Sequence, residues 1–374
     1  MMRRLLLLLL AVLAFSPAEA RAADDSWHLV SLNRREYVTL HDFCRFYGFD
    51  FPGAMDGKVC VLKGPRGTLR LQLDSAAIYL NGVRYYLCFP VVESDGNWLL
   101  SRLDLSYLLE PALRPYRISG RRAFLGVVID AGHGGTDNGA TSTRGKMEKN
   151  YALDTAFRLE AILRKHNIQT VLTRRRDEFV PLEERARFGE RYKDFIFVAI
   201  HFNSANPAAR GLETYVETPR GAASTSSEGY LRMSDYQRVP GNEQDMWNTL
   251  LGYEIHRQII RLNPGDTEAD RGLKRARFVV LKENSLPSVL VEGGFLTNPL
   301  EAAAVDLPLY RQRLADAIAT GIENFLQESS DQPVATPANA PRPVPVAAPA
   351  PAPAASEQSE TEADFRPAEE DRNP

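Results

Sequence analysis

The 374-residue chain has only three cysteines and, after its first residues, no long apolar stretch. Cys44, Cys60 and Cys88 form no CxxC or similar spacing, which argues against a cysteine-ligated zinc site. No later stretch stays apolar for about 18 residues, so we expect no stable membrane span in the mature form. The formal charge is −3, and residues 331–374 hold eight acids against three arginines, which leaves about +2 elsewhere. This charge distribution therefore gives no indication of a basic surface for nucleic-acid binding.

Residues 1–23 have the pattern of a secretory signal peptide. Arg3 and Arg4 precede an apolar run, and small residues follow it. No cysteine near this point could carry a lipid anchor. We expect a protein exported to the periplasm, the cell envelope or the extracellular space. In an oxidising compartment the three cysteines could form one disulfide with one thiol left over, or remain three buried thiols.

Residues 24–120 are expected to form a small α+β domain. The segments "VCVLKG", "TLRLQL" and "VRYYL" indicate strands, "REYVTLHDFCRFYGF" contains a small helix, and an Asn-Gly turn at Asn81 joins two strands. The pattern resembles the stalk-type domain found at the N-terminus of copper amine oxidases and on many cell-wall enzymes. Copper is not implied, because His28 and His41 are the only histidines there. Wall binding, oligomerisation and support of the catalytic domain are all compatible with this sequence.

Residues 121–328 are expected to form an α/β domain with a mostly parallel sheet and helices on both faces. The segments "FLGVVIDA", "IQTVLTR", "DFIFVAIH", "GLETYVE", "ARFVVL" and "PSVLVEGGF" predict strands. Longer stretches such as "KNYALDTAFRLEAILRKH" and "PLEERARFGERY" alternate with them and predict helices, the last one over residues 309–327. Apolar strands alternating with helices call for a sheet covered on both faces. Residues 329–374, rich in proline and alanine and then acidic, predict a disordered tail.

Polar residues mark the ends of three of these predicted strands. His133 follows "VVIDAG", His201 ends "DFIFVAIH", and Glu292 ends "PSVLVE". Glu148 opens the first long helix, so the connection between strand and helix brings it to the same edge. Ligands collect outside the carboxyl ends of parallel strands. Two imidazoles and two carboxylates are therefore expected to meet there.

This combination is typical of a catalytic zinc centre. Two histidines and one carboxylate that leave a fourth position to water form a ligand set of catalytic zinc, and they favour zinc over manganese or cobalt. The metal lowers the pKa of bound water and polarises a carbonyl, while a second carboxylate takes the proton. The glycines around His133 leave space for metal and substrate. Asp130 and Asp137 are candidates to orient a ligand.

Six blocks occur in order through residues 124–326: "VVIDAGHGGTDNGA", "MEKNYALDTAFRLEAIL", "VLTRRRDEFVPLEERA", "FVAIHFNSA", "GLETYVETP" and "RGLKRARFVVLKENSLPSVLVEGGFLTNP". Together they resemble the zinc-dependent N-acetylmuramoyl-L-alanine amidases of the type 3 family. The resemblance implies that His133, Glu148 and His201 bind one Zn²⁺ and that Glu292 is the catalytic carboxylate. It implies hydrolysis of the amide between N-acetylmuramic acid and L-alanine, with peptidoglycan as the partner. Asn203 is a candidate to contact the substrate.

Five other residues match recurrent positions of this family. We expect three of them to brace the fold through ion pairs: Arg174, Asp177 and Arg185. Glu213 and Arg271 match as well, without an assigned role.

Residues 219–245 form a polar insertion that is expected beside the site. Some amidases of this family carry there a helix that covers the zinc until an activator protein displaces it. The stretch "SSEGYLRMSDY" could form such a helix, so a gate and a plain surface loop both remain open. An alternative function is a catalytically silent or partner-activated peptidoglycan-binding protein, and a third is a peptidase acting within the peptide stem. The retained histidines and glutamates argue against a silent protein.

Overall fold

A computed structural model describes residues 27–52, 57–227 and 229–330 of the chain. The predicted signal peptide and the predicted tail beyond residue 330 lie outside the described residues. Among the described helices, none combines the length and apolar character that crossing a membrane requires.

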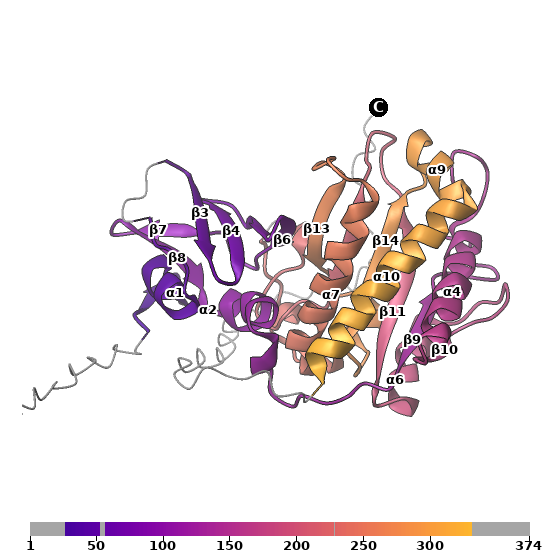
Figure 1. Cartoon of the computed structure of the whole chain (residues 1–374), viewed down its shortest axis with the longest axis horizontal. Coiled ribbons are helices and arrows are strands. Elements are labelled where there is room, and N and C mark those ends of the chain that lie inside the picture. The colour runs from indigo at the N-terminus through magenta and orange to yellow at the C-terminus, as the bar shows by residue number, and fades with distance from the viewer. Residues whose placement is uncertain (1–26, 53–56, 228, 331–374) are drawn as a thin grey trace, which may run out of the picture.

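A ten-stranded sheet forms the centre of the molecule, in the order β10-β9-β11-β14-β12-β13-β6-β5-β4-β3 (Figure 1). Its strands are β3 (Val59–Gly64), β4 (Gly67–Gln72), β5 (Ala77–Leu80), β6 (Val83–Tyr86), β9 (Gly126–Ala131), β10 (Gln169–Leu172), β11 (Phe195–Asn203), β12 (Leu212–Val216), β13 (Asp270–Arg275) and β14 (Ser288–Phe295). From β10 to β13 every neighbouring pair is parallel except β14 and β12. The predicted mostly parallel sheet is confirmed.

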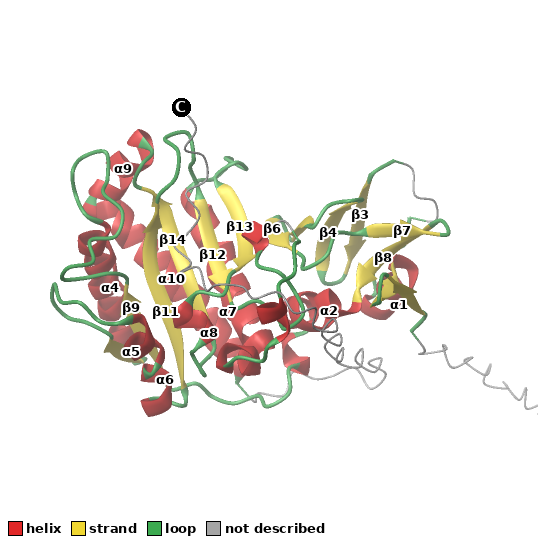
Figure 2. Cartoon of the chain, turned by 180° about the vertical axis from the view of Figure 1, so that it is seen from behind, coloured by secondary structure: helices red, strands yellow, loops and turns green. Residues whose placement is uncertain are grey.

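Helices cover both faces of this sheet. One face packs against α4 (Glu148–Lys165), α7 (Asp245–Ile259) and α10 (Pro308–Ser329), which lie in front of the strands in Figure 1. The other face packs against α5 (Leu182–Ala186), α6 (Phe188–Arg191) and α8 (Val279–Lys282), seen from behind in Figure 2. Every residue of β9 is buried, so Val127 and Val128 face two separate apolar cores. Helix α9 (Pro299–Asp306) follows β14 at the upper edge of the sheet.

The N-terminal region adds a second sheet of four strands, in the order β1-β2-β8-β7. Its elements are β1 (Leu29–Leu32), β2 (Arg35–Thr39), α1 (Leu40–Tyr47), β7 (Val92–Ser94), β8 (Asn97–Ser101), α2 (Arg102–Asp104), η1 (Leu105–Leu109), α3 (Glu110–Leu113) and η2 (Pro115–Arg117). Helix α1 begins where the Thr39 hydroxyl accepts from the Asp42 amide, and it ends at Gly48 in a left-handed conformation. The predicted hairpin is present, with Asn81 and Gly82 between β5 and β6.

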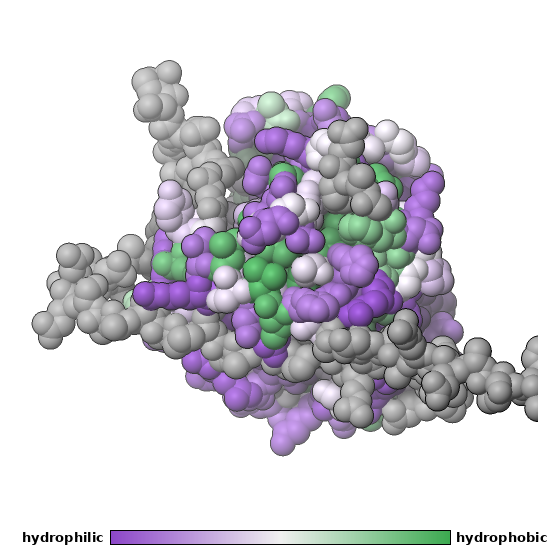
Figure 3. Space-filling view, turned by 90° about the vertical axis from the view of Figure 1, so that its left-hand side faces the viewer, coloured by the Kyte–Doolittle hydropathy of each residue, from purple (hydrophilic) through white to green (hydrophobic). Residues whose placement is uncertain are grey.

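On the face that the N-terminal region presents in Figure 3, hydrophobic side chains (green) gather in places among hydrophilic ones (purple). Val59 and Val61 of the edge strand β3 are exposed. The three cysteines are buried free thiols, so the structure contains no disulfide among the described residues.

Strand β6 of the N-terminal region pairs in parallel with β13, so one sheet runs across the predicted domain boundary. The Arg275 guanidinium donates to the carbonyl oxygens of Tyr86 and Leu87. Asp270 accepts from the Arg84 amide at 2.8 Å. The two predicted regions therefore share main-chain hydrogen bonds as well as one hydrophobic core.

Two predicted elements differ from the structure. The segment 276–281 was expected to be a strand, but the strand is β13 and "VVLK" forms the short helix α8. A run of apolar residues fits a buried strand or a buried helical turn equally well, whereas β13 is mostly polar and escapes the pattern. The single helix expected over "PLEERARFGERY" is two short helices, α5 and α6.

The insertion 219–245 lies at the opposite end of the sheet from the predicted site, so its expected position beside the site is wrong. Strand β12 runs antiparallel to β14, with Glu213 opposite Glu292 and Tyr215 opposite Leu290. The chain therefore leaves β12 toward the start of β14. Its described part forms the 3₁₀ turns η3 (Thr225–Ser227), η4 (Met233–Tyr236) and η5 (Pro240–Gln244). Arg277 ties it down through Asp235 at 2.9 Å.

Candidate metal centre

His133 lies in the turn after β9, in a left-handed backbone conformation with φ of 59°. Two buried arginines hold this turn. Arg174 donates to the carbonyl oxygens of Ala131 at 2.9 Å and Gly132 at 2.8 Å. Arg185 donates to the His133 carbonyl oxygen at 2.7 Å. These bonds fix the backbone from which the imidazole projects.

The three residues expected to brace the fold do so in different ways. Arg185 forms a buried ion pair with Asp130 at 2.8 Å. Asp177 pairs with Lys149 at 3.0 Å. Arg174 donates to main-chain carbonyl oxygens instead.

Asp137 contacts His133 directly, whereas Asp130 does not. The Asp137 carboxylate lies 2.8 Å from His133 Nδ1. Asp130 accepts from Thr173 at 2.6 Å and from Arg185. Its influence on His133 passes through Arg185.

Glu148 is the first residue of α4 and is almost fully buried. Its Oε2 accepts from the Ala140 amide at 2.9 Å, and its Oε1 accepts from the Phe202 amide at 3.0 Å. Two main-chain donors thus offset part of the cost of burying this carboxylate and hold its orientation.

His133, Glu148 and His201 converge at one point. Glu148 Oε1 lies 3.1 Å from His133 Nε2 and 2.9 Å from His201 Nδ1. One ligand atom from each residue lies within 4.8 Å of the others. Zinc binds nitrogen and oxygen ligands at about 2.0–2.2 Å, so two ligand atoms of one ion lie closer than about twice that distance. The chemistry and the spacing of these residues fit one zinc ion.

The charges within this group also favour a cation. Burial alone would lower the pKa of His133, but hydrogen bonds and charge interactions with Glu148 and Asp137 raise it above its usual value. Burial would raise the pKa of Glu148, but the two imidazoles hold it well below its usual range. The carboxylate is therefore kept ionised among groups that are all suitable metal ligands.

Two glycines give the imidazoles their space. A Cβ added at Gly132 would lie 2.4 Å from Cε1 of His201. One added at Gly139 would lie 2.5 Å from Glu148 Oε2 and 2.6 Å from His133 Cδ2. Gly139 was not singled out from the sequence, although it lies in the same block. Gly134 instead makes room for the carbonyl oxygen of Glu178.

Glu292 lies next to His201 in the register of β14 and β11. Its Oε2 is buried and has no hydrogen-bond partner among the described residues. Burial, and then the charges of Glu148 and Glu213, raise the pKa of Glu292 well above its usual value. A carboxyl group in this state can hold a proton and release it, which is what a general acid and base must do.

Glu213 lies opposite Glu292 on β12 and is the centre of a polar cluster that the sequence did not reveal. It accepts from Lys274 at 2.9 Å, from the Tyr215 hydroxyl at 2.6 Å and from Arg271. Burial would raise the pKa of Glu213, but Lys274 and Arg271 lower it. From the sequence, only the match of Glu213 and Arg271 to recurrent positions of the family pointed to this cluster. The positions of Lys274 and Tyr215 depend on strand pairing.

Asn203, the predicted substrate contact, ends β11 two residues after His201. Its Nδ2 donates to Glu213 Oε2 at 3.1 Å, and its Oδ1 accepts from the Ser204 amide at 2.8 Å. The side chain is only partly buried, so it is held in place at the edge of the site.

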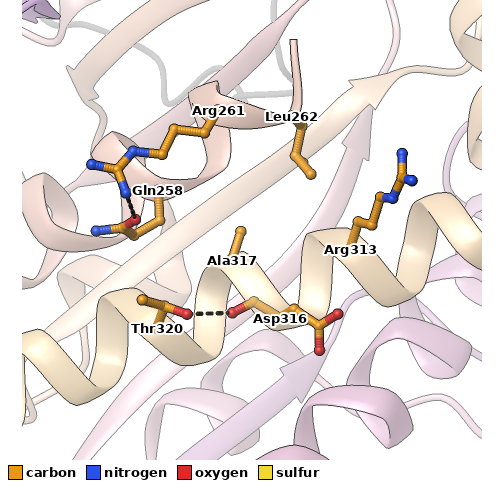
Figure 4. Close-up of a pocket in the computed structure, with 7 residues that line it drawn as sticks. All are labelled: Gln258, Arg261, Leu262, Arg313, Asp316, Ala317 and Thr320. Carbon is orange, nitrogen blue, oxygen red and sulfur yellow. Dashed lines mark hydrogen bonds between the residues drawn. The ribbon is translucent and has the colours of Figure 1, made fainter. Parts of the chain in front are cut away.

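A surface pocket between α7, η6 (Ile260–Leu262) and α10 lies elsewhere (Figure 4). It is lined by Gln258, Arg261, Leu262, Arg313, Asp316, Ala317 and Thr320. It contains none of the predicted site residues. The candidate metal centre, in contrast, brings together side chains that could bind a metal ion.

The chain is similar to one family model and to several known proteins. The family model described as N-acetylmuramoyl-L-alanine amidase matches residues 127–324, which include all four predicted zinc and catalytic residues. N-acetylmuramoyl-L-alanine amidase AmiA of Salmonella typhimurium is 34% identical over 231 residues, covering 56% of this chain and 79% of the relative. AmiA of Escherichia coli is 34% identical over 227 residues, covering 55% and 78%. The solved structure of the amidase AmiC2 of Nostoc punctiforme is 36% identical, covers 54% of this chain and 97% of that one, and has a TM-score of 0.44.

Proposed function

This chain belongs to the N-acetylmuramoyl-L-alanine amidase family and is a peptidoglycan amidase, and we propose that it works with one zinc ion held by His133, Glu148 and His201. One observation carries the proposal: three possible ligand atoms of the right chemistry lie together beside Glu292, whose buried Oε2 has no hydrogen-bond partner in the part of the chain that the structure describes. The bond cleaved joins the lactyl group of N-acetylmuramic acid to L-alanine.

In this proposal the protein supplies orientation and proton transfer. When bound, zinc polarises the amide carbonyl and makes water more acidic. Glu292 accepts the proton of the attacking water and passes it to the nitrogen of the leaving L-alanine. Asp137 holds the imidazole of His133, and the two main-chain donors hold Glu148. Asn203 is proposed to contact the substrate, because it is fixed by Glu213 at the edge of the site.

The cellular setting is also a proposal. The N-terminal pattern of residues 1–23 supports export to the periplasm or cell envelope, where peptidoglycan lies. We propose that residues 24–120 help to place the enzyme on the wall. An activator protein stays a prediction, but it would not act by displacing residues 219–245 from the zinc, because these leave β12 at the far end.

Digestion of purified peptidoglycan tests the function. The mature protein should release intact stem peptides that begin with L-alanine, as identified by mass spectrometry. A chelator should abolish release and added zinc should restore it. Peptides with another N-terminal residue would indicate a peptidase.

The variant Glu292→Gln tests the proposed proton transfer. It should lower kcat at least about 100-fold, the lower range of general acid–base catalysis, while it still binds about one zinc ion. The matched control is Glu283→Gln at an exposed position, which should keep full activity. If wild-type protein binds zinc and sacculi but releases nothing, a catalytically silent binding protein is the better description.

A further inference from the structure

The sheet face that carries Glu292 continues beyond the catalytic region. Paired residues of neighbouring strands point to the same face. Glu292 is opposite Glu213, and Tyr215, two residues further along β12, is opposite Lys274 of β13. Leu273 pairs with Tyr85 of β6, and both point to the opposite face of the sheet. The next residues along the two strands, Lys274 and Tyr86, therefore lie side by side on the face that carries Glu292. The Lys274 ammonium lies 5.9 Å from the centre of the Tyr86 ring.

The same face then crosses the strands of the N-terminal region. Arg84, two residues before Tyr86, pairs with Tyr79 of β5, and Tyr79 pairs with Arg70 of β4. The Arg70 guanidinium lies 5.6 Å from the Tyr79 ring, and Arg84 lies 5.4 Å from the Tyr86 ring. We call Tyr86, Arg84, Tyr79 and Arg70 the stem platform. It is a row of alternating arginine and tyrosine side chains that starts beside the Glu213 cluster.

The stem platform is accessible and basic. Helix α8 covers this face only as far as Tyr215, which packs against Phe278, and the face is toward the viewer in Figure 2. Arg70 is exposed, and Tyr79, Arg84 and Tyr86 are partly exposed. Neither arginine forms an ion pair within the described ranges, and the buried Nε of Arg84 has no hydrogen-bond partner there. Strands β3, β4, β5 and β6 carry no acidic residue on this face. The positions on this face are 59, 61, 63, 68, 70, 72, 77, 79, 84 and 86.

We propose that the stem platform binds the peptide stem of the substrate and pairs its arginines with the carboxylates of that stem. The proposal rests on the proposed function, because the amide cleaved beside Glu292 joins the first residue of the stem. Four strand spacings of about 4.8 Å separate β14 from β5, so Tyr79 is about 19 Å from Glu292. An extended peptide of five residues spans about 17 Å. A stem that starts at the metal centre therefore places its C-terminal carboxylate near Arg84 and Arg70.

The side chains suit such an occupant. Arginine pairs with carboxylates through two parallel hydrogen bonds, and the tyrosine rings offer flat apolar surfaces with a polar tip. The N-terminal region would thus form part of the substrate site, through strands that are hydrogen-bonded to the catalytic sheet.

Stem length is the variable to test. The zinc-loaded full-length enzyme is assayed on soluble N-acetylmuramoyl peptides with a dipeptide or a pentapeptide stem. The wild type should have the higher kcat/KM on the long stem. The double variant Arg70→Gln, Arg84→Gln should lose about tenfold in kcat/KM on the long stem, mainly through KM, and nothing on the dipeptide. Amidation of the pentapeptide's C-terminus should remove the same advantage from the wild type.

Two further variants keep the test independent of folding. Arg70→Gln alone changes an exposed side chain and should give a smaller loss in the same direction. Arg313→Gln on α10, on the other face of the sheet, is the matched control and should match the wild type on both substrates (Figure 4). An unchanged ratio of long-stem to short-stem kcat/KM in the double variant would overturn the stem platform while leaving the amidase intact. Failure of the wild type on both substrates would overturn the proposed function itself.

Discussion

The absence of a side chain at Gly132 is what allows His201 to occupy its position. A Cβ there would lie 2.4 to 2.7 Å from three atoms of the His201 ring, and its φ is not in the left-handed region. Alanine at position 132 is therefore tolerated by the backbone but displaces the imidazole of His201, a proposed zinc ligand. We expect Gly132→Ala to weaken zinc binding about 10- to 100-fold in a competition titration with a chelator. Gly82→Ala is the control for a general loss of stability, because it strains a backbone with φ of 81° while its Cβ meets nothing within 4 Å. Equal zinc affinity of both variants would contradict this role of Gly132.

At the residue scale, the sequence predicts that His133, Glu148 and His201 lie together, but it does not predict the side chains around them. His133 follows β9 by two residues, and His201 and Glu292 lie two and three residues before the ends of β11 and β14. These three strands are parallel, so the three residues lie toward the same edge of the sheet, as the local pattern predicts. The contacts of Glu213 with Lys274 and Arg271 join residues about 60 positions apart through the pairing of β12 with β13. No local pattern encodes that pairing.

At the element scale, the turn after β9 depends on one buried ion pair. Arg185 joins Asp130 of the strand to the carbonyl oxygens of Ala131 and His133. Arg185→Gln leaves Asp130 as an uncompensated buried charge, which should lower the free energy of unfolding by about 3–5 kcal/mol in urea titrations. The double variant with Asp130→Asn should recover part of this loss, since the charge is then removed. If the loss in the double variant equalled the sum of the losses in Arg185→Gln and Asp130→Asn alone, the ion pair would not be the cause.

A second buried acid, at the far end of β12, should make stability depend on pH. Burial, together with the charge of Asp245, raises the pKa of Glu217 to about 8, although Arg277 opposes the shift. Between the ordinary pKa near 4.5 and pH 8, the unfolded chain has released this proton while the folded chain keeps it. Stability from this group is therefore present at low pH and is lost as pH rises through that window. Glu217→Gln should gain stability relative to the wild type from pH 5 to pH 9, measured by urea unfolding at each pH. The exposed Glu283→Gln should show no such trend.

The wrongly predicted elements and the missed Glu213 cluster have the same physical origin, because both depend on contacts between strands that are far apart in the sequence. The apolar segment 276–281 was expected to be a strand, whereas the polar β13 is the strand because its charged side chains find partners in the fold. Asp270 accepts from His256 and from the Arg84 amide, and Arg275 donates to carbonyl oxygens after β6. The direction of β12 is also set by pairing with β14, and it decides on which edge residues 219–245 lie.

At the scale of the whole molecule, the N-terminal region covers what would otherwise be an open edge of the catalytic sheet. An uncovered edge strand offers unpaired main-chain groups to other chains. Strand β6 pairs with β13, and the ring of Tyr85 lies 6.3 Å from that of Tyr253 on α7. The Asn81 amide reaches the Tyr253 hydroxyl at 3.2 Å. The two regions are therefore expected to unfold together.

A chain that begins at residue 121 should consequently be less stable and should self-associate. Removal of β6 leaves β13 unpaired on one side, deprives Arg275 of two acceptors and exposes apolar side chains of α7. We expect the free energy of unfolding to fall by roughly 3 kcal/mol or more, the scale of one or two large apolar side chains losing their cover. Urea unfolding and light scattering measure the two effects. Arg275→Gln in the full chain removes only the guanidinium contacts and should cause a smaller loss without association. A truncated protein that stayed monomeric and as stable as the full chain would show that the shared sheet contributes little, and that the N-terminal region acts independently.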